Sequence, residues 1–412
     1  MLKKLSSMAV FSFMATLATF AFQTIATHLL TPADYGVLAR WLTDIGYLGM
    51  FFVLGLDSSI LYHAKLGEKY EDNMGKNFMI YFIVFLLSFL VVFTFKLDSR
   101  YYIPLFVSII SLSITSVFKS YFHYREEYLW FNLLGLLLPI GLVITFGIAY
   151  FIDLKFEIYQ ALNAYAVISF IVLILVGIKY FTVASVSFNK DLFKQISYFL
   201  YGIKSILNKV LSLTLYASTV YILSFFGKLE AVAFFFVASS ISKMVWVLPD
   251  SAGNVLYPRF LKIGKEYKKI NILNEMNYYA QIVFVFNILT ILAFGVLGHF
   301  ILGLLYSNAY HVIFVPVIIL LIGNQGMVYF KLLSRYLAAM NNWKPLYFSL
   351  VVGIIVNIGL NFILIPLYGL IGACIATSFS FICCGLFISI FVKGSLYGFL
   401  NLRSFFTVQF SK

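Results

Sequence analysis

The sequence is divided into about twelve apolar runs, each close to the roughly 20 residues that an α-helix needs to cross a bilayer. Of the 412 residues, 62% are hydrophobic and only 11% are charged, whereas a soluble domain carries roughly 25% charged residues. Such a chain could not cover its surface in water. We therefore expect an all-α polytopic membrane protein with about twelve transmembrane helices, at residues 6–30, 37–61, 78–95, 102–122, 129–151, 161–181, 203–226, 231–256, 280–302, 312–337, 346–367 and 370–392.

The excess of 29 Lys and Arg over 16 Asp and Glu gives a net charge of +13. Cytoplasmic loops of membrane proteins collect Lys and Arg, so this excess does not indicate a nucleic-acid partner. With the N-terminus inside, most of the cations outside the spans fall in inner segments. Both termini are thus predicted to be cytoplasmic, and the outer loops hold only Lys96, Arg100, Lys155 and Lys228.

A polar joint at residues 182–195 separates two sets of six predicted spans. We expect an N-terminal six-helix lobe at 1–181, a cytoplasmic linker at 182–195, a C-terminal six-helix lobe at 196–392 and a cytoplasmic tail at 393–412. Two matching halves are typical of transporters.

Several cations fall inside the predicted spans, where each charge costs at least about 2.5–3.5 kcal/mol at the helix centre. Lys209 and Lys243 lie deep and are candidates to line a cavity, and Lys204 is less deep. Lys331 and Arg335 share a helix face near a cytoplasmic end, where they either snorkel to the headgroups or meet an anion.

Arg40 and Asp44 are four residues apart, so they share a helix face. They either neutralise one another or form a gate in which Asp44 takes up a proton and couples transport to an ion gradient. With few acids beside the intramembrane cations, a cavity lined by these residues would attract an anionic substrate.

Motifs for catalysis are missing from the sequence. It has no Gly-rich phosphate loop, and the five histidines stand singly rather than at a metal-ligand spacing. We therefore expect no catalytic residues, no metal and no cofactor, and thus no enzyme.

Several segments resemble the polysaccharide-exporter branch of the multidrug/oligosaccharidyl-lipid/polysaccharide (MOP) flippase superfamily. The turn at residues 29–36 (LLTPADYG) is similar to the family's Leu-x-Pro-x-x-Tyr-Gly turn, and residues 53–59 and 256–260 carry shorter similarities. The most specific match is residues 356–377 (VNIGLNFILIPLYGLIGACIAT), which resembles a family run with the same Asn, Pro, Gly and Ala-Thr positions. In that run Pro366 would end a helix and Gly369 would permit a tight turn.

The resemblance covers nearly the whole chain and implies a MATE-like fold, V-shaped around a central cavity. It implies an O-antigen flippase of the Wzx type in the bacterial inner membrane. Its substrate would be undecaprenyl-pyrophosphate-linked oligosaccharide repeat units, moved by alternating access on a proton or sodium gradient. The implied partners are membrane lipid, a polysaccharide polymerase and a chain-length regulator. In one departure, residues 216–220 (YASTV) lack an acid that family members often carry there.

Three alternatives stay open at this stage. A MATE-type cation-coupled drug exporter should show an acidic cavity, and a lipid II flippase usually has about two more helices. An O-antigen polymerase, which would be an enzyme, should have a large external loop with catalytic arginine.

Overall fold

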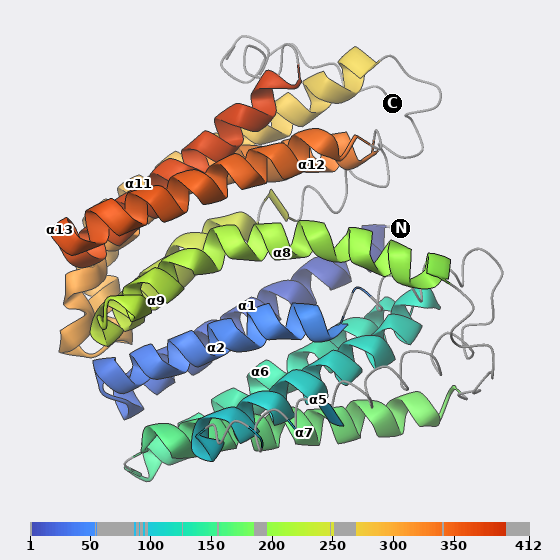
Figure 1. The fold of residues 1–412 in the computed structure, drawn as a ribbon, viewed down its shortest axis with the longest axis vertical. Helices are drawn as coiled ribbons and strands as arrows, with labels where there is room; N and C mark the ends of the chain where they lie inside the picture. Colours follow the sequence, from blue (N-terminus) through green and yellow to red (C-terminus); the bar gives the residue numbers. More distant parts are fainter. Residues whose placement is uncertain are drawn as a thin grey trace. The chain divides into compact units, whose positions relative to one another are not determined.

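The computed structural model describes residues 2–53, 98–125, 127–154, 156–184, 196–247, 249–250, 269–339 and 342–392, together with isolated positions at 55, 86, 87, 90 and 94. Within these residues every regular element is helical, which confirms the expected all-α architecture (Figure 1). In hydrocarbon a helix satisfies its backbone polar groups internally, so apolar runs of this length fold no other way. Seven helical stretches of the described residues are long and apolar enough to cross a membrane.

The chain divides into two compact units, Met1–Leu213 and Thr214–Lys412. The first unit contains α1 (Leu2–Leu29), α2 (Pro32–Val53), α5 (Ser99–Tyr124), α6 (Tyr128–Phe151) and α7 (Ile158–Phe181). It also takes in the first part of α8 (Ile196–Phe225).

The turn between α1 and α2 shows how the sequence sets a helix boundary. The backbone N–H of Asp34 donates to the Thr31 side chain at 3.2 Å, and the Thr31 hydroxyl donates to the Asp34 carboxylate at 2.7 Å. Thr31 thus caps α2, and Pro32 occupies the first helical position, where no N–H is needed. On α2, the buried Trp41 packs edge-on against Tyr165 of α7, with ring centroids 5.3 Å apart.

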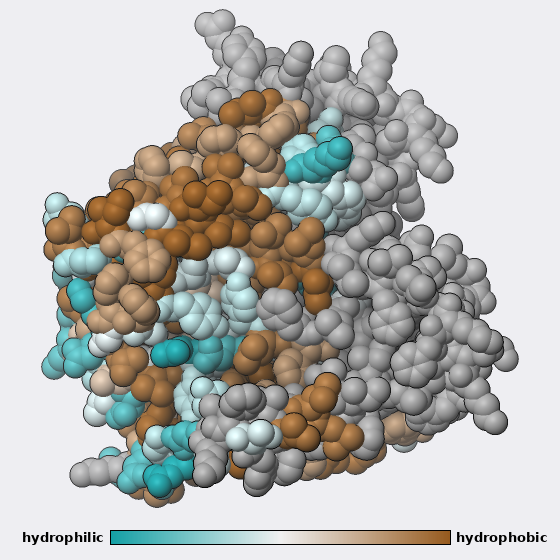
Figure 2. Space-filling view, in the orientation of Figure 1, coloured by the Kyte–Doolittle hydropathy of each residue, from teal (hydrophilic) through white to brown (hydrophobic). Residues whose placement is uncertain are grey.

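The second unit contains the rest of α8, then α9 (Leu229–Lys243), the 3-10 turn η1 (Met244–Trp246) and α11 (Lys269–Leu305). A second 3-10 turn, η2 (Asn308–Ile313), leads into α12 (Phe314–Ala339) and α13 (Lys344–Ile390). Large apolar side chains of α11 stay exposed, including Val296, Phe300 and Leu304. Figure 2 likewise shows hydrophobic side chains over much of α12 and α13. These surfaces suit contact with lipid.

The 47-residue element α13 is a hairpin of two helical arms. Gly369 lies between them with φ 56° and ψ −126°, a conformation that glycine adopts without strain. Asn357 of the first arm donates to Ser380 of the second at 3.1 Å, and an added Cβ on Gly353 would lie 3.3 Å from the Cβ of Cys384. The prediction of two spans joined by a tight turn at Gly369 is thus confirmed.

The described part of each predicted span lies on helical residues, except at the ends of those parts, at residues 30, 55, 226 and 391–392. Residues 54 and 56–61 of the second span and 248 and 251–256 of the eighth lie outside the described residues. The span expected at residues 78–95 lies outside them apart from four positions, so the total of twelve stays a prediction. The linker expected at 182–195 lies largely outside the described residues, and so does the tail at 393–412. The sixth and seventh spans are α7 and α8, on either side of that linker.

Candidate functional site

A group of aromatic and charged side chains in the second unit brings together two of the predicted cations. Lys243 ends α9, and Trp246 follows three residues later in η1. The Nζ of Lys243 lies 5.6 Å from the ring centroid of Trp246 and 5.6 Å from that of Tyr216 on α8. From α12, the Nζ of Lys331 lies 4.5 Å from the centroid of the same Trp246 ring. We call Tyr216, Lys243, Trp246, Asp250 and Lys331 the cation–aromatic cluster.

The position of Trp246 is fixed by packing against neighbouring rings. Its ring centroid lies 5.1 Å from that of Tyr216 and 6.0 Å from that of Phe381 on α13. The end of α9 is tied to α12 because the amide of Asn324 donates to the carbonyl of Ser242 at 2.8 Å. This bond holds the next residue, Lys243, close to α12.

An ammonium ion over the face of tryptophan is stabilised by about 0.5–1 kcal/mol when exposed and about 2 kcal/mol or more when desolvated. Each of two ammonium groups on one indole ring is attracted to the ring, but the two repel each other. The ring makes the two lysines tolerable in an apolar setting, and a shared anion between them would remove the repulsion.

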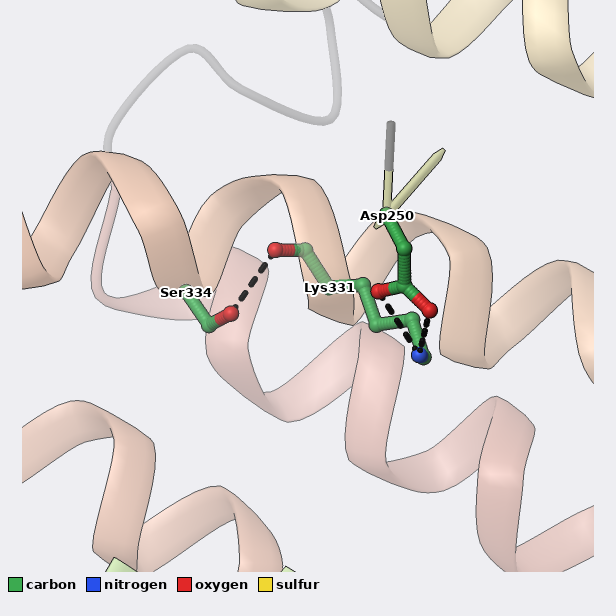
Figure 3. Close-up of polar contacts among 3 residues, drawn as sticks. All are labelled: Asp250, Lys331 and Ser334. Carbon is green, nitrogen blue, oxygen red and sulfur yellow. Dashed lines mark hydrogen bonds and ion pairs between the residues drawn. The ribbon is translucent and has the colours of Figure 1, made fainter. Parts of the chain in front are cut away.

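One carboxylate compensates one of the two lysines. Lys331 donates to both carboxylate oxygens of Asp250, at 2.7 and 2.9 Å (Figure 3). Lys243 has no carboxylate within ion-pair distance among the described residues. Arg335, one turn after Lys331 on α12, also has no ion pair in that part of the chain, and its side chain is half-buried. The cluster therefore carries an excess of positive charge.

The indole N–H of Trp246 is a buried donor without a hydrogen-bond partner in the described structure. Other buried polar atoms of the described residues, such as Oδ1 of Asn324, also have no partner, so what distinguishes this N–H is its place beside two lysines. Beside two ammonium groups, an unused N–H donor suits an anionic oxygen that a substrate would supply.

The other predicted site residues lie in the first unit. Lys209 of α8 lines a pocket of about 320 Å³ together with residues of α2 and α5, including Gly46, Gly49 and Ser113. Open space faces Gly49, because a Cβ added there would meet nothing within 4 Å. Lys204 lies on the same helix, but its side chain is outside the described residues.

Arg40 and Asp44 do not pair with each other in the described structure. The Arg40 side chain is exposed, whereas Asp44 is half-buried and accepts a hydrogen bond of 2.7 Å from the hydroxyl of Tyr101 on α5. The first of the two readings of this pair, mutual neutralisation, thus gains no support from a direct ion pair among the described residues. A coupling role for Asp44 stays a prediction.

A buried polar network joins α8 to both arms of α13. The side-chain oxygen of Asn357 accepts from Ser218 at 2.7 Å, from Thr219 at 3.3 Å and from Asn361 at 2.9 Å. Thr219 and Thr377 share a further hydrogen bond of 2.9 Å. Between helices in a membrane, such hydrogen bonds stabilise helix association. Ser218 and Thr219, in the acid-free segment 216–220, thus hold α13 in place.

Sequence reasoning singled out Lys243 and Lys331 but missed Trp246 and Tyr216. The spacing of three residues between Lys243 and Trp246 could have indicated that they share a helix face. Nothing in the sequence joins Tyr216 to Lys331, since their contact with the same ring arises from helix packing.

No protein-family model matches the chain, and no curated protein matches it in sequence. Solved structures do match in fold. Lipid II flippase MurJ, in an inward-closed conformation, is similar with a TM-score of 0.75 at 17% identity, covering 98% of this chain and 93% of that one. An inward-facing multidrug resistance MATE family transporter of the MOP superfamily gives a TM-score of 0.73 at 12% identity, covering 96% of both chains.

A MOP superfamily transporter from Pyrococcus furiosus, described by a reverse polarity of its binding pocket, gives a TM-score of 0.65 at 14% identity. The match covers 98% of this chain and 96% of that one. All three neighbours are transporters rather than enzymes, and all three are matched over nearly their whole length. This multi-pass membrane protein therefore has the fold of MOP-superfamily transporters.

Proposed function

We propose that the chain is a flippase that carries undecaprenyl-pyrophosphate-linked oligosaccharide repeat units, of an O-antigen or a similar surface polysaccharide, across the bacterial inner membrane. The observation that carries the proposal is the cation–aromatic cluster in a transporter fold. Lys243 and Lys331 lie over one indole ring, and among the described residues only Lys331 is paired with a carboxylate, that of Asp250, so the cluster favours an anion.

A diphosphate suits this cluster better than an organic cation does. Its oxygens accept hydrogen bonds from both ammonium groups and from the unused N–H of Trp246. The tryptophan and tyrosine faces suit the sugar rings, and the polyprenyl tail would stay in lipid. Lys209, Lys204, Arg40 and Arg335 are proposed as further cationic contacts for the substrate, with Asp44 coupling alternating access to a proton or sodium gradient.

The lipid II flippase among the structural neighbours supports a lipid-linked glycan as the substrate class. The second candidate is a MATE-like drug exporter, because transporters of that family match the fold equally broadly. The excess of cations in the cluster favours the first candidate, since a site for cationic drugs should be acidic.

The experiment uses a strain without this gene, complemented by plasmid-borne variants at matched expression. The double variant Lys243→Gln and Lys331→Gln should lose most surface polysaccharide and accumulate lipid-linked repeat units on the cytoplasmic face. Lys344→Gln is the control, because it removes a cation from an exposed position in the same unit. Full surface polysaccharide from the double variant would refute the assignment, and altered drug sensitivity alone would favour the exporter.

A further inference from the structure

The ion pair between Asp250 and Lys331 lies where the proposed substrate would bind. The Asp250 side chain is 43% exposed and that of Lys331 is 19% exposed, so the carboxylate is the more accessible partner. On α12, the hydroxyl of Ser334 donates to the carbonyl of Lys331 at 2.7 Å, as Figure 3 shows. The lysine thus comes from a helix interior, while its partner approaches from the segment that follows η1.

Both carboxylate oxygens of Asp250 accept hydrogen bonds from the ammonium group of Lys331, as the oxygens of a phosphate group would. A phosphate that draws on the charge of Lys331 must therefore compete with this carboxylate. Lys243, 5.6 Å from the Trp246 centroid, has no such carboxylate in the described structure and needs no displacement. The two lysines therefore differ in how easily an anion reaches them.

The bilayer presents a competing anion at high concentration, because many phospholipids carry a single negative charge. Two lysines without a carboxylate partner would each be open to such headgroups. Specificity of this kind often needs an element that penalises the wrong ligand. A resident carboxylate supplies such a penalty. A ligand binds only if its attraction to the two lysines exceeds the attraction between Lys331 and Asp250 that it replaces.

We propose that Asp250 is a resident counter-ion that sets the selectivity of the cation–aromatic cluster for diphosphate over singly charged headgroups. A diphosphate carries charge on two linked phosphates, so one can meet Lys243 while the other replaces Asp250 at Lys331. A singly charged headgroup can neutralise only one lysine and leaves the ion pair intact. This inference rests on the proposed function, because it assumes that the cluster binds the substrate's diphosphate.

The test measures binding of inorganic diphosphate to the full-length protein in nanodiscs, made either of phosphatidylcholine alone or with added phosphatidylglycerol. In the wild type, phosphatidylglycerol can compete for Lys243 alone, so it should weaken the affinity less than it does in Asp250→Asn. In Asp250→Asn, the affinity in phosphatidylcholine should rise, and phosphatidylglycerol should weaken it about tenfold or more, because the headgroup can now occupy Lys331.

Two further variants keep the result interpretable. Asp250→Glu retains the charge and should behave as the wild type does, which shows that Asp250→Asn acts through charge rather than misfolding. Glu230→Gln removes an exposed carboxylate from the first turn of α9 and controls for the change in net charge.

Equal weakening by phosphatidylglycerol in the wild type, Asp250→Asn and Glu230→Gln would overturn the role of Asp250. A different failure would be that diphosphate does not bind the wild type, or that it binds Lys331→Gln as tightly as the wild type. That outcome would refute the headgroup site of the proposed function itself, so the two failures are distinguishable.

Discussion

A close backbone contact between α12 and α13 predicts a large effect for a single methyl group. A Cβ added to Gly326 of α12 would lie 2.5 Å from the Cα of Ile382 and 2.7 Å from its backbone nitrogen. It would also overlap the carbonyl oxygen of Phe381. All three are backbone atoms of α13, so no side-chain rotation can relieve the overlap.

The magnitude follows from this geometry. Ordinary van der Waals contact begins near 3.4 Å, so α12 and α13 would have to separate by about 1 Å at this point. Overpacking of this kind costs about 1–3 kcal/mol. In the membrane the helix pair has no hydrophobic effect to compensate, because close packing itself drives association. We expect Gly326→Ala to destabilise the protein by about 2 kcal/mol.

The assay compares the thermal unfolding of Gly326→Ala with that of Gly359→Ala in the same detergent. Gly359 lies on α13 with nothing within 4 Å of an added Cβ, and alanine favours a helix over glycine by about 1 kcal/mol. The control variant should therefore be as stable as the wild type or more stable. Equal stability of the two variants would refute the reasoning.

Function should change along with stability, because the affected contact lies beside the cation–aromatic cluster. The ring of Phe381, whose carbonyl would be displaced, packs 6.0 Å from Trp246 and 5.9 Å from Tyr216. Gly326→Ala is thus expected to weaken diphosphate binding even at temperatures where the protein stays folded. Unchanged affinity in the folded protein would show that the cluster does not depend on this helix contact.

Two further predictions concern α13. Gly369→Ala should cost about 1–2 kcal/mol, because φ is 56° there and an L side chain strains that conformation; a thermal unfolding midpoint equal to that of the wild type would contradict it. Asn357→Leu should cost about 1–3 kcal/mol, because it removes the acceptor of the Ser218 hydroxyl and the donor to Ser380; the same measurement checks it, and a stabilised variant would show that the network adds nothing.

Much of the fold could be predicted from the sequence because the bilayer leaves few choices. An apolar run of about 20 residues must be a helix there. The turn at Gly369 could be predicted too, since Pro366 and Gly369 stand between two such runs and glycine alone takes a positive φ without strain. Both signals are local, so a single sequence reveals them.

The candidate site could be predicted only in part. Lys243 and Lys331 stood out because charge in an apolar run is costly, which is again a local signal. Their common contact with Trp246 and the pairing of Lys331 with Asp250 depend on how α9 and α12 pack. Asp44 shows the same limit: its spacing from Arg40 suggested an ion pair, yet its hydrogen-bond donor is Tyr101, on another helix.

The most direct test of the account is transbilayer movement of a polyprenyl-diphosphate-linked oligosaccharide in liposomes that contain only the purified protein. The fraction of substrate on the outer face is read by a membrane-impermeant lectin. We predict movement by the wild type and by Lys344→Gln, and at least tenfold slower movement by the double variant Lys243→Gln and Lys331→Gln. Movement at the wild-type rate by the double variant, or none by the wild type under an imposed proton or sodium gradient, would contradict the account.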